Sequence, residues 1–202
     1  MPSVFERLRA SLPLTHAPWQ VEPDQSRWPQ AAVLIALTAQ DTPHVLLGRR
    51  AAHLKTHPGE IAFPGGKREA VDATPWETAL RETTEEVGIP AANVTHIAEL
   101  EPLITRTGFQ VHPCIGTIDP DPTLIVDEGE FDSVFMRPLT VFADANLFRL
   151  EPMTKGGSTM YVPHYQVEND NIWGVTAAML AQLANVAYDA GFDLQRNWKK
   201  KP

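Results

Sequence analysis

Short apolar runs bounded by Pro, Gly and Asp recur along most of the chain and predict β-strands. We expect strands at residues 31–37, 44–49, 60–63, 96–102, 110–118 and 158–166. The sequence Asp41-Thr42-Pro43 predicts a turn between the first two strands. An acidic segment at residues 128–136 follows a second turn, Pro120-Asp121-Pro122, and residues 140–147 predict a turn or a short helix.

Apolar residues at spacings of three and four predict helices near both ends of the chain. A short amphipathic helix is expected at Val4–Leu12, where Pro13 ends it, and a longer one at Val175–Asp189. The apolar contacts of the longer helix come from Ala177, Met179, Leu180, Leu183, Ala184 and Val186. Strands interleaved with a few helices favour an α+β fold.

Local signals define one further helix between Thr74 and Gly88. Thr74 is placed to be the N-cap and Pro75 the first helical residue, and Glu77 completes the pattern of a capping box. Gly88 is placed to end the helix, and Pro90 prevents its continuation. The residues expected to face the core are Trp76, Leu80, Thr83 and Val87.

This helix carries three glutamates at helical spacing. Glu82 and Glu85 are separated by three residues and Glu82 and Glu86 by four, so all three carboxylates are expected to converge. Arg81, four residues before Glu85, is placed to hold that carboxylate. Oxygen ligands without Cys or His favour Mg²⁺ or Mn²⁺ over zinc. The alternative interpretation is a solvated acidic helix face.

Together with Pro64-Gly65-Gly66, the glutamates resemble the Nudix box, whose pattern is G-x5-E-x7-R-E-U-x-E-E-x-G-U with U aliphatic. The residues that match by type are Gly66, Arg81, Glu82, Glu85, Glu86, Gly88 and Ile89. Two features depart from the pattern. The segment between Gly66 and Arg81 is one residue longer, so Asp72 best fills the acidic position, and Thr83 replaces an aliphatic residue.

The residues before the box resemble the signature of one Nudix branch, the coenzyme A (CoA) pyrophosphatases, L-L-T-x-R-[SA]-x3-R-x3-G-x3-F-P-G-G. In this chain Gly48 stands for the Thr and Lys55 for the second Arg. The segments that begin at Glu130-Phe131 and at Ile172-Trp173 also resemble that branch, so the likeness covers roughly residues 30–185.

The resemblance implies a Nudix fold, with a mixed β-sheet core sandwiched between helices, over residues 30–194. It also implies Mg²⁺ or Mn²⁺ as cofactor, with Glu82, Glu85 and Glu86 as metal ligands. Glu85 is in addition a candidate proton acceptor, and Arg81 is expected to orient a glutamate. Glu130, outside the box, is the candidate for a further base, with Glu128 next; a solvated acidic loop is the alternative.

Substrate contacts are expected from Arg49, Arg50, Lys55, Gly65 and Gly66. The basic residues are suited to the 3′-phosphate of CoA, because arginine and lysine bind phosphate; the alternative is a solvated hairpin end. The glycines would let the backbone approach the metal site closely. His57 is interpreted as a positioning residue in a turn, and Trp173 and Phe63 as packing residues.

The expected reaction is therefore hydrolysis of the diphosphate of CoA or acyl-CoA to 3′,5′-ADP and (acyl-)4′-phosphopantetheine. Two alternatives stay open. One is a Nudix diphosphatase for ADP-ribose or another nucleoside diphosphate derivative. The other is a non-catalytic nucleotide-binding module, which the complete set of Arg81, Glu82, Glu85 and Glu86 disfavours.

The composition of the chain limits its expected partners and cellular location. A net charge of −8 argues against a nucleic-acid partner, and 43% hydrophobic residues is typical of a globular domain. No run is long enough for a membrane span, there is no signal peptide, and the single cysteine, Cys114, is expected to be buried, so we expect a cytoplasmic location. Residues 1–29 predict a helix and an extended arm packed on the domain, and residues 195–202 a disordered tail. A homodimer is among the assemblies left open.

Overall fold

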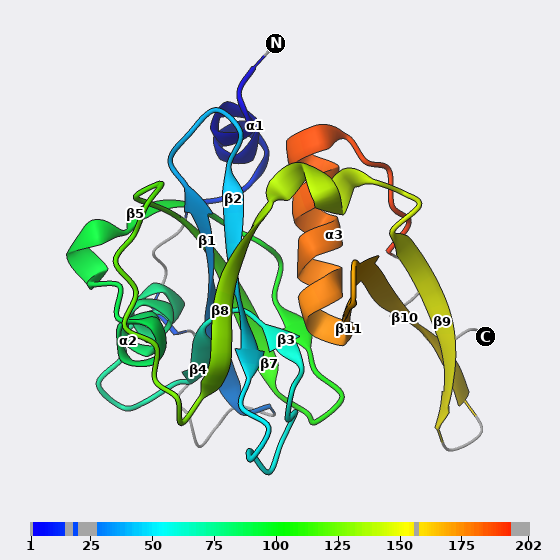
Figure 1. Cartoon of the computed structure of the whole chain (residues 1–202), viewed down its shortest axis with the longest axis horizontal. Helices are drawn as coiled ribbons and strands as arrows, with labels where there is room; N and C mark the ends of the chain where they lie inside the picture. Colours follow the sequence, from blue (N-terminus) through cyan, green and yellow to red (C-terminus); the bar gives the residue numbers. More distant parts are fainter. Residues whose placement is uncertain (1, 15–17, 20–27, 156–157, 195–202) are drawn as a thin grey trace.

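The computed structural model describes residues 2–14, 18–19, 28–155 and 158–194 (Figure 1). Its helices are α1 (Val4–Ser11), α2 (Pro75–Val87) and α3 (Gly174–Tyr188), with short 3₁₀ helices η1 (Ala91–Asn93) and η2 (Leu139–Ala143). Its strands are β1 (Gln30–Thr38), β2 (His44–Arg50), β3 (Ile61–Ala62), β4 (Gly65–Lys67), β5 (Thr95–Glu99), β6 (Leu103–Ile104), β7 (Gln110–Ile118), β8 (Phe131–Pro138), β9 (Phe148–Lys155), β10 (Ser158–Val167) and β11 (Asp170–Trp173).

Eight of these strands form one mixed sheet, in which β3-β2-β1-β7-β5 is the continuous order. Strands β1 and β7 run parallel, with Leu34 opposite Cys114, and the other pairs are antiparallel. Strand β4 pairs with β1, β6 with β7 and β8 with β2. A separate antiparallel sheet has the order β11-β10-β9.

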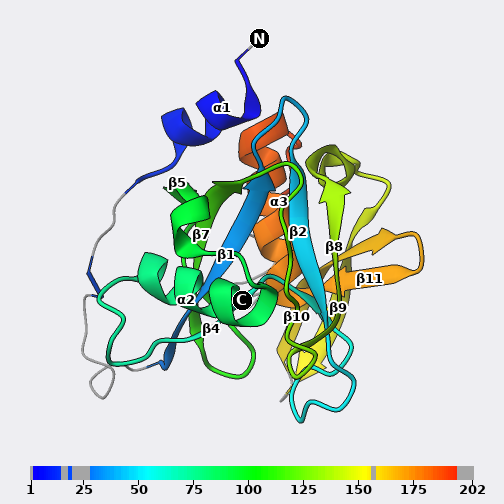
Figure 2. The ribbon, with the colours of Figure 1, turned by 60° about the vertical axis from the view of Figure 1, so that its left-hand side comes forward.

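Strand β1 is apolar on both faces because each face of the large sheet is covered by a helix. Leu34 belongs to the core on the side of α2, whereas Ile35 and Leu37 belong to the core on the side of α3. Figures 1 and 2 show α2 and α3 on opposite sides of the sheet. The prediction of an α+β Nudix fold, with a mixed sheet between helices, is confirmed.

Most predicted elements are present, but the small sheet was only partly expected. The sequence predicts β10, whereas β9 escapes prediction because charged residues interrupt it and Pro152 lies within it. A proline is tolerated there because β9 is an edge strand. This difference matters for function, since β9 and β10 contribute to the cleft described below.

The N-terminal helix α1 lies against the domain. Leu8 is fully buried in the core on the α3 side, and Arg7 forms an ion pair with Asp189 just after α3. The predicted arm falls partly, and the predicted tail at 195–202 wholly, outside the described residues. The division of the chain at residue 30 stays a prediction. Cys114 is fully buried, as expected. None of the helices in the described segments is long and apolar enough to cross a membrane.

Candidate active site

Helix α2, which carries the glutamates, begins and ends where its local signals predict. The Thr74 hydroxyl accepts a hydrogen bond from the backbone N–H of Glu77 at 3.1 Å, and Gly88 ends the helix with φ of 74°. The capping box is only half formed, however. The Glu77 carboxylate accepts from the N–H of Ala73 at 2.6 Å, one residue before the N-cap.

The buried side of α2 differs from the predicted one. Thr83 and Val87 are buried as expected, but Trp76 and Leu80 are only half-buried, and Trp76 stacks on His96. Thr78, Ala79 and Glu86 are buried in their place. The inward side of the helix therefore includes an acidic residue.

Glu86 is 5% exposed and lies against the glycine turn. Its Oε2 accepts a hydrogen bond from the backbone N–H of Gly65 at 2.8 Å. Burial raises the pKa of Glu86 to about 8, and the negative charges of Glu82 and Glu130 add to that increase. A buried carboxylate that faces two others is costly as an anion unless a cation neutralises it.

Glu82 lies against the second glycine of the turn. A Cβ atom on Gly66 would lie 2.4 Å from the carboxyl carbon of Glu82, so any other residue there would displace that carboxylate. Burial is also the main reason why the pKa of Glu82 is raised, although the positive charge of Arg81 opposes that shift. The glycine turn thus contacts both Glu82 and Glu86 through its backbone.

Glu85 lies apart from the other two helix glutamates. Its side chain is 59% exposed and is paired with Nη1 of Arg81 at 3.2 Å. Successive residues of a helix are rotated by about 100°, which turns Glu85 away from the side shared by Glu82 and Glu86. Glu85 therefore does not share the buried side of α2 with Glu86, and within the described residues no group of three or more His, Cys, Asp or Glu side chains is arranged to hold a metal ion. The assignment of Glu82, Glu85 and Glu86 as metal ligands stays a prediction.

Arg81 is fixed by the loop that precedes the helix. Its Nε and Nη2 bind the two carboxylate oxygens of Asp72 at 3.1 and 3.0 Å. Burial alone would raise the pKa of Asp72, but hydrogen bonds from Arg81, the N–H of Glu69 and the Thr78 hydroxyl lower it overall. Nη2 of Arg81 also lies 3.0 Å from Oε1 of Glu82. Arg81 therefore orients glutamates, and Asp72 holds Arg81 in place.

Glu130 lies on the loop between β7 and β8, close enough to Glu86 for its charge to raise the pKa of that residue. We call Glu82, Glu86 and Glu130 the carboxylate cluster. Its carboxylate lies 3.4 Å from Nη2 of Arg50, and the loop is joined to α2 because the N–H of Asp127 donates to the Glu86 carbonyl. The next residue, Phe131, is fully buried, and its ring fills the space in which a Cβ on Gly48 would lie. This packing accounts for Gly48 at the position where the CoA signature has Thr. Glu128, in contrast, is exposed.

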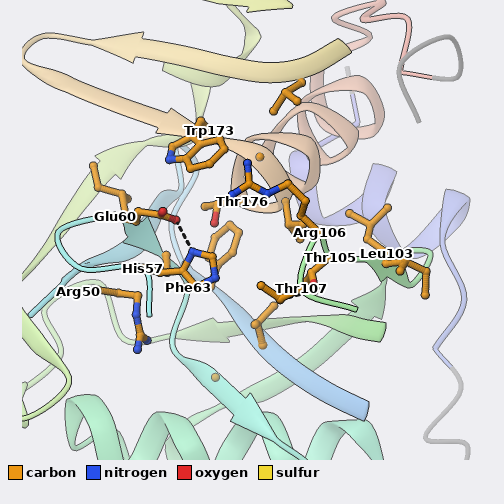
Figure 3. Close-up of a pocket in the computed structure, with 18 of the residues that line it drawn as sticks. Arg50, His57, Glu60, Phe63, Leu103, Thr105, Arg106, Thr107, Trp173 and Thr176 are labelled. Carbon is orange, nitrogen blue, oxygen red and sulfur yellow. Dashed lines mark hydrogen bonds and ion pairs between the residues drawn. The ribbon is translucent and has the colours of Figure 1, made fainter. Parts of the chain in front are cut away.

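A cleft of about 650 Å³ opens beside the cluster, between the large sheet, the small sheet and the start of α3 (Figure 3). Gly65 and Arg50 line its end nearest the carboxylates. The other residues that line it include His57, Glu60, Phe63, Leu103, Thr105, Arg106, Thr107, Met153, Met160, Val162, Trp173 and Thr176. The glutamates of the cluster lie beyond Gly65 and do not themselves line the cleft.

The structure does not bring the predicted basic residues together. Arg49 forms an ion pair with Asp170, and the exposed Lys55 is not part of the cleft lining, so only Arg50 reaches the cleft. Adjacent residues of a strand point to opposite faces, which separates Arg49 from Arg50 on β2. His57 has a left-handed backbone (φ of 57°), and its Nδ1 lies 2.9 Å from Oε2 of Glu60.

Sequence reasoning missed the far side of the cleft. Trp173 was interpreted as a packing residue, yet it lines the cleft together with Arg106 from the loop between β6 and β7. The sequence signal there is weak, since a polar turn at Thr105–Gly108 is typical of any hairpin loop. Phe63 is 4% exposed, so it packs as expected and also forms part of the cleft wall.

Comparisons with known proteins point to the Nudix family. A family model described as the NUDIX domain matches residues 28–154. The uncharacterized Nudix hydrolase NudL of Yersinia enterocolitica is 40% identical over 154 residues, which cover 76% of this chain and 79% of that protein. The protein of the same name from Pectobacterium atrosepticum is 41% identical over 157 residues, covering 77% and 81%. The crystal structure of the Nudix hydrolase RenU from M. smegmatis aligns with a TM-score of 0.47 at 21% identity, covering 55% of this chain and 71% of that one.

Replacing Glu86 by Gln tests the buried carboxylate. The substitution keeps the shape and the acceptor for the Gly65 N–H but removes the negative charge of a candidate metal ligand. We expect metal-dependent turnover to fall by about 10²-fold or more, because metal charge stabilisation amounts to several kcal/mol. The thermal unfolding midpoint in EDTA should stay equal or rise, since burial raises the pKa of Glu86 and so disfavours its ionised form, whereas Gln has no ionised form. A variant with near-normal turnover at limiting Mg²⁺ would show that the site is elsewhere.

Replacing Glu130 by Gln tests the carboxylate outside the helix. If Glu130 accepts a proton in the transition state, kcat should fall by about 10²–10⁴-fold with KM nearly unchanged. Glu128→Gln is the matched control, because Glu128 is on the same loop but exposed. Steady-state measurement of kcat and KM for both variants would decide whether Glu130 has this role. If kcat of Glu130→Gln stays within a few-fold of the parent, Glu130 is not the base, and Glu85 becomes the candidate.

Proposed function

The chain belongs to the Nudix hydrolase family, and within that family we propose that it hydrolyses the diphosphate of CoA or acyl-CoA. The products would be 3′,5′-ADP and (acyl-)4′-phosphopantetheine. The observation that carries the hydrolytic part is the buried Glu86, faced by Glu82 and Glu130 at one end of a large cleft. The CoA part is supported by the resemblance of residues 46–66 to the CoA signature.

The carboxylate cluster suits a divalent ion. Nudix hydrolases generally use ions such as Mg²⁺ or Mn²⁺. Glu82 and Glu86 would hold the ion, since both are largely buried and carry pKa values raised by burial. All donors are oxygen atoms, as hard cations require. When bound, such an ion neutralises diphosphate oxygens and lowers the pKa of its water.

The chain's own residues would supply orientation and proton transfer. Glu130 is proposed to accept the proton of the attacking water, and Arg50, 3.4 Å from its carboxylate, to contact the diphosphate from the cleft. Arg81 is a positioning residue, because Asp72 fixes it against Glu82. Glu85, held by Arg81 on the exposed side, is the alternative proton acceptor or an added ligand.

The shape of the cleft suits a long substrate with an apolar part. Beyond Arg50 its walls are largely apolar, and they come from Phe63, Leu103, Met153, Met160 and Trp173. A ligand site of this kind combines apolar walls with a few polar anchors. An adenine ring or a pantetheine arm would fit such walls, whereas the charged diphosphate would remain near Arg50 and the glycine turn.

The substrate assignment is tested by comparing CoA with dephospho-CoA, which lacks only the 3′-phosphate. One charge-assisted contact contributes about 1.5–3 kcal/mol, so kcat/KM should be about tenfold or more higher for CoA. ADP-ribose and a dinucleotide complete the substrate panel. Equal efficiency on CoA and dephospho-CoA, or a clear preference for ADP-ribose, would contradict the CoA assignment and leave the Nudix chemistry intact. Absence of metal-dependent turnover on the panel would favour a binding module.

A further inference from the structure

Arg106 lies at the rim of the cleft, on the loop between β6 and β7. Its guanidinium carbon is 5.5 Å from the centroid of the Trp173 ring, and its Nη1 is 3.1 Å from the sulfur of Met153. Figure 3 shows Arg106 across the cleft from Arg50. Two apolar side chains from the small sheet therefore hold this cation at the opposite side from the carboxylate cluster.

Arg106 differs from the other arginines near the cleft in what it pairs with. Arg49 is paired with Asp170 and Arg50 with Glu130. Among the residues that the structure describes, no carboxylate lies within ion-pair distance of Arg106. A guanidinium held over an aromatic face keeps its donors directed outward, and its planar fork matches phosphate oxygens.

Other groups near Arg106 would also suit a negatively charged ligand. Thr176 brings a hydroxyl group to the same part of the cleft. Thr105 and Thr107 line it too, but their hydroxyl groups bond to each other at 3.0 Å, and that of Thr105 also accepts from the N–H of Phe109. The first turn of α3 also lines the cleft there, and its N-cap residue, Trp173, has no side-chain acceptor for the free N–H groups. A negatively charged group at this place would therefore meet donors from several elements, beside the aromatic ring of Trp173.

We propose that Arg106, positioned by Trp173 and Met153, binds the 3′-phosphate of CoA and so determines the preference for CoA over its dephospho form. This assignment rests on the proposed function. It replaces the expectation that Arg49 and Lys55 receive that phosphate, because neither residue lines the cleft. The adenine ring would then lie near Trp173, with the diphosphate towards Arg50.

The test combines two substitutions of Arg106 with one change of substrate. kcat/KM for CoA and for dephospho-CoA would be measured in the parent, Arg106→Gln and Arg106→Lys. For Arg106→Gln we expect about a tenfold loss on CoA and less than a twofold change on dephospho-CoA, so that the discrimination disappears. Arg106→Lys should retain part of it, because lysine keeps the charge but loses the fork. Arg9→Gln, at an exposed site on α1, is the matched control.

A binding measurement gives a readout that does not depend on turnover. The parent should bind 3′,5′-ADP about tenfold more tightly than 5′-AMP in calorimetric titrations, and Arg106→Gln should bind both equally. Two results overturn the inference alone: a parent that prefers CoA with an Arg106→Gln variant that keeps the preference, or loss of the preference in Lys55→Gln instead. A parent without any preference for CoA overturns the proposed substrate and the inference with it.

Discussion

The like-charge repulsion between the buried Glu86 and the nearby Glu82 and Glu130 is the interaction on which the candidate site depends. Burial and these two neighbours raise the pKa of Glu86, and one hydrogen bond from the Gly65 N–H is the main local compensation. Carboxylates buried this close together are costly as anions unless a cation or hydrogen-bond donors compensate their charge. The glycine turn belongs to the same arrangement, because a side chain on Gly66 would displace the Glu82 carboxylate and a Cβ on Gly65 would lie 2.4 Å from the backbone oxygen of Ala32.

The rest of the fold holds this cluster in place. Asp72 fixes Arg81, Arg81 orients Glu82 and Glu85, and a backbone bond from Asp127 to Glu86 ties the β7–β8 loop to α2. The mixed sheet separates α2 from α3 and places the cleft at the edge where the small sheet begins. The carboxylates and the cleft thus come from different layers, which meet at Gly65 and Arg50.

The sequence predicted best those features that depend on neighbouring residues. The bounds of α2 follow from Thr74, Pro75 and Gly88, which act within one helical turn. The sequence also held the evidence to separate Arg49 from Arg50, since neighbours on a strand point apart. The proximity of Glu130 to Glu86 and the place of Arg106 over Trp173 depend on contacts between distant segments. Helical spacing did predict the pair of Arg81 and Glu85, but it could not reveal that the side of α2 carrying Glu86 is the buried one.

The most direct test of the central claim is the position of the ion itself. A crystal soaked in Mn²⁺ would be analysed by anomalous scattering at the manganese edge. The account predicts a peak within coordination distance, about 2.0–2.3 Å, of oxygens from Glu86 and at least one of Glu82 and Glu130. A peak bound only by the exposed Glu85, or no peak in the cluster at saturating Mn²⁺, would contradict it.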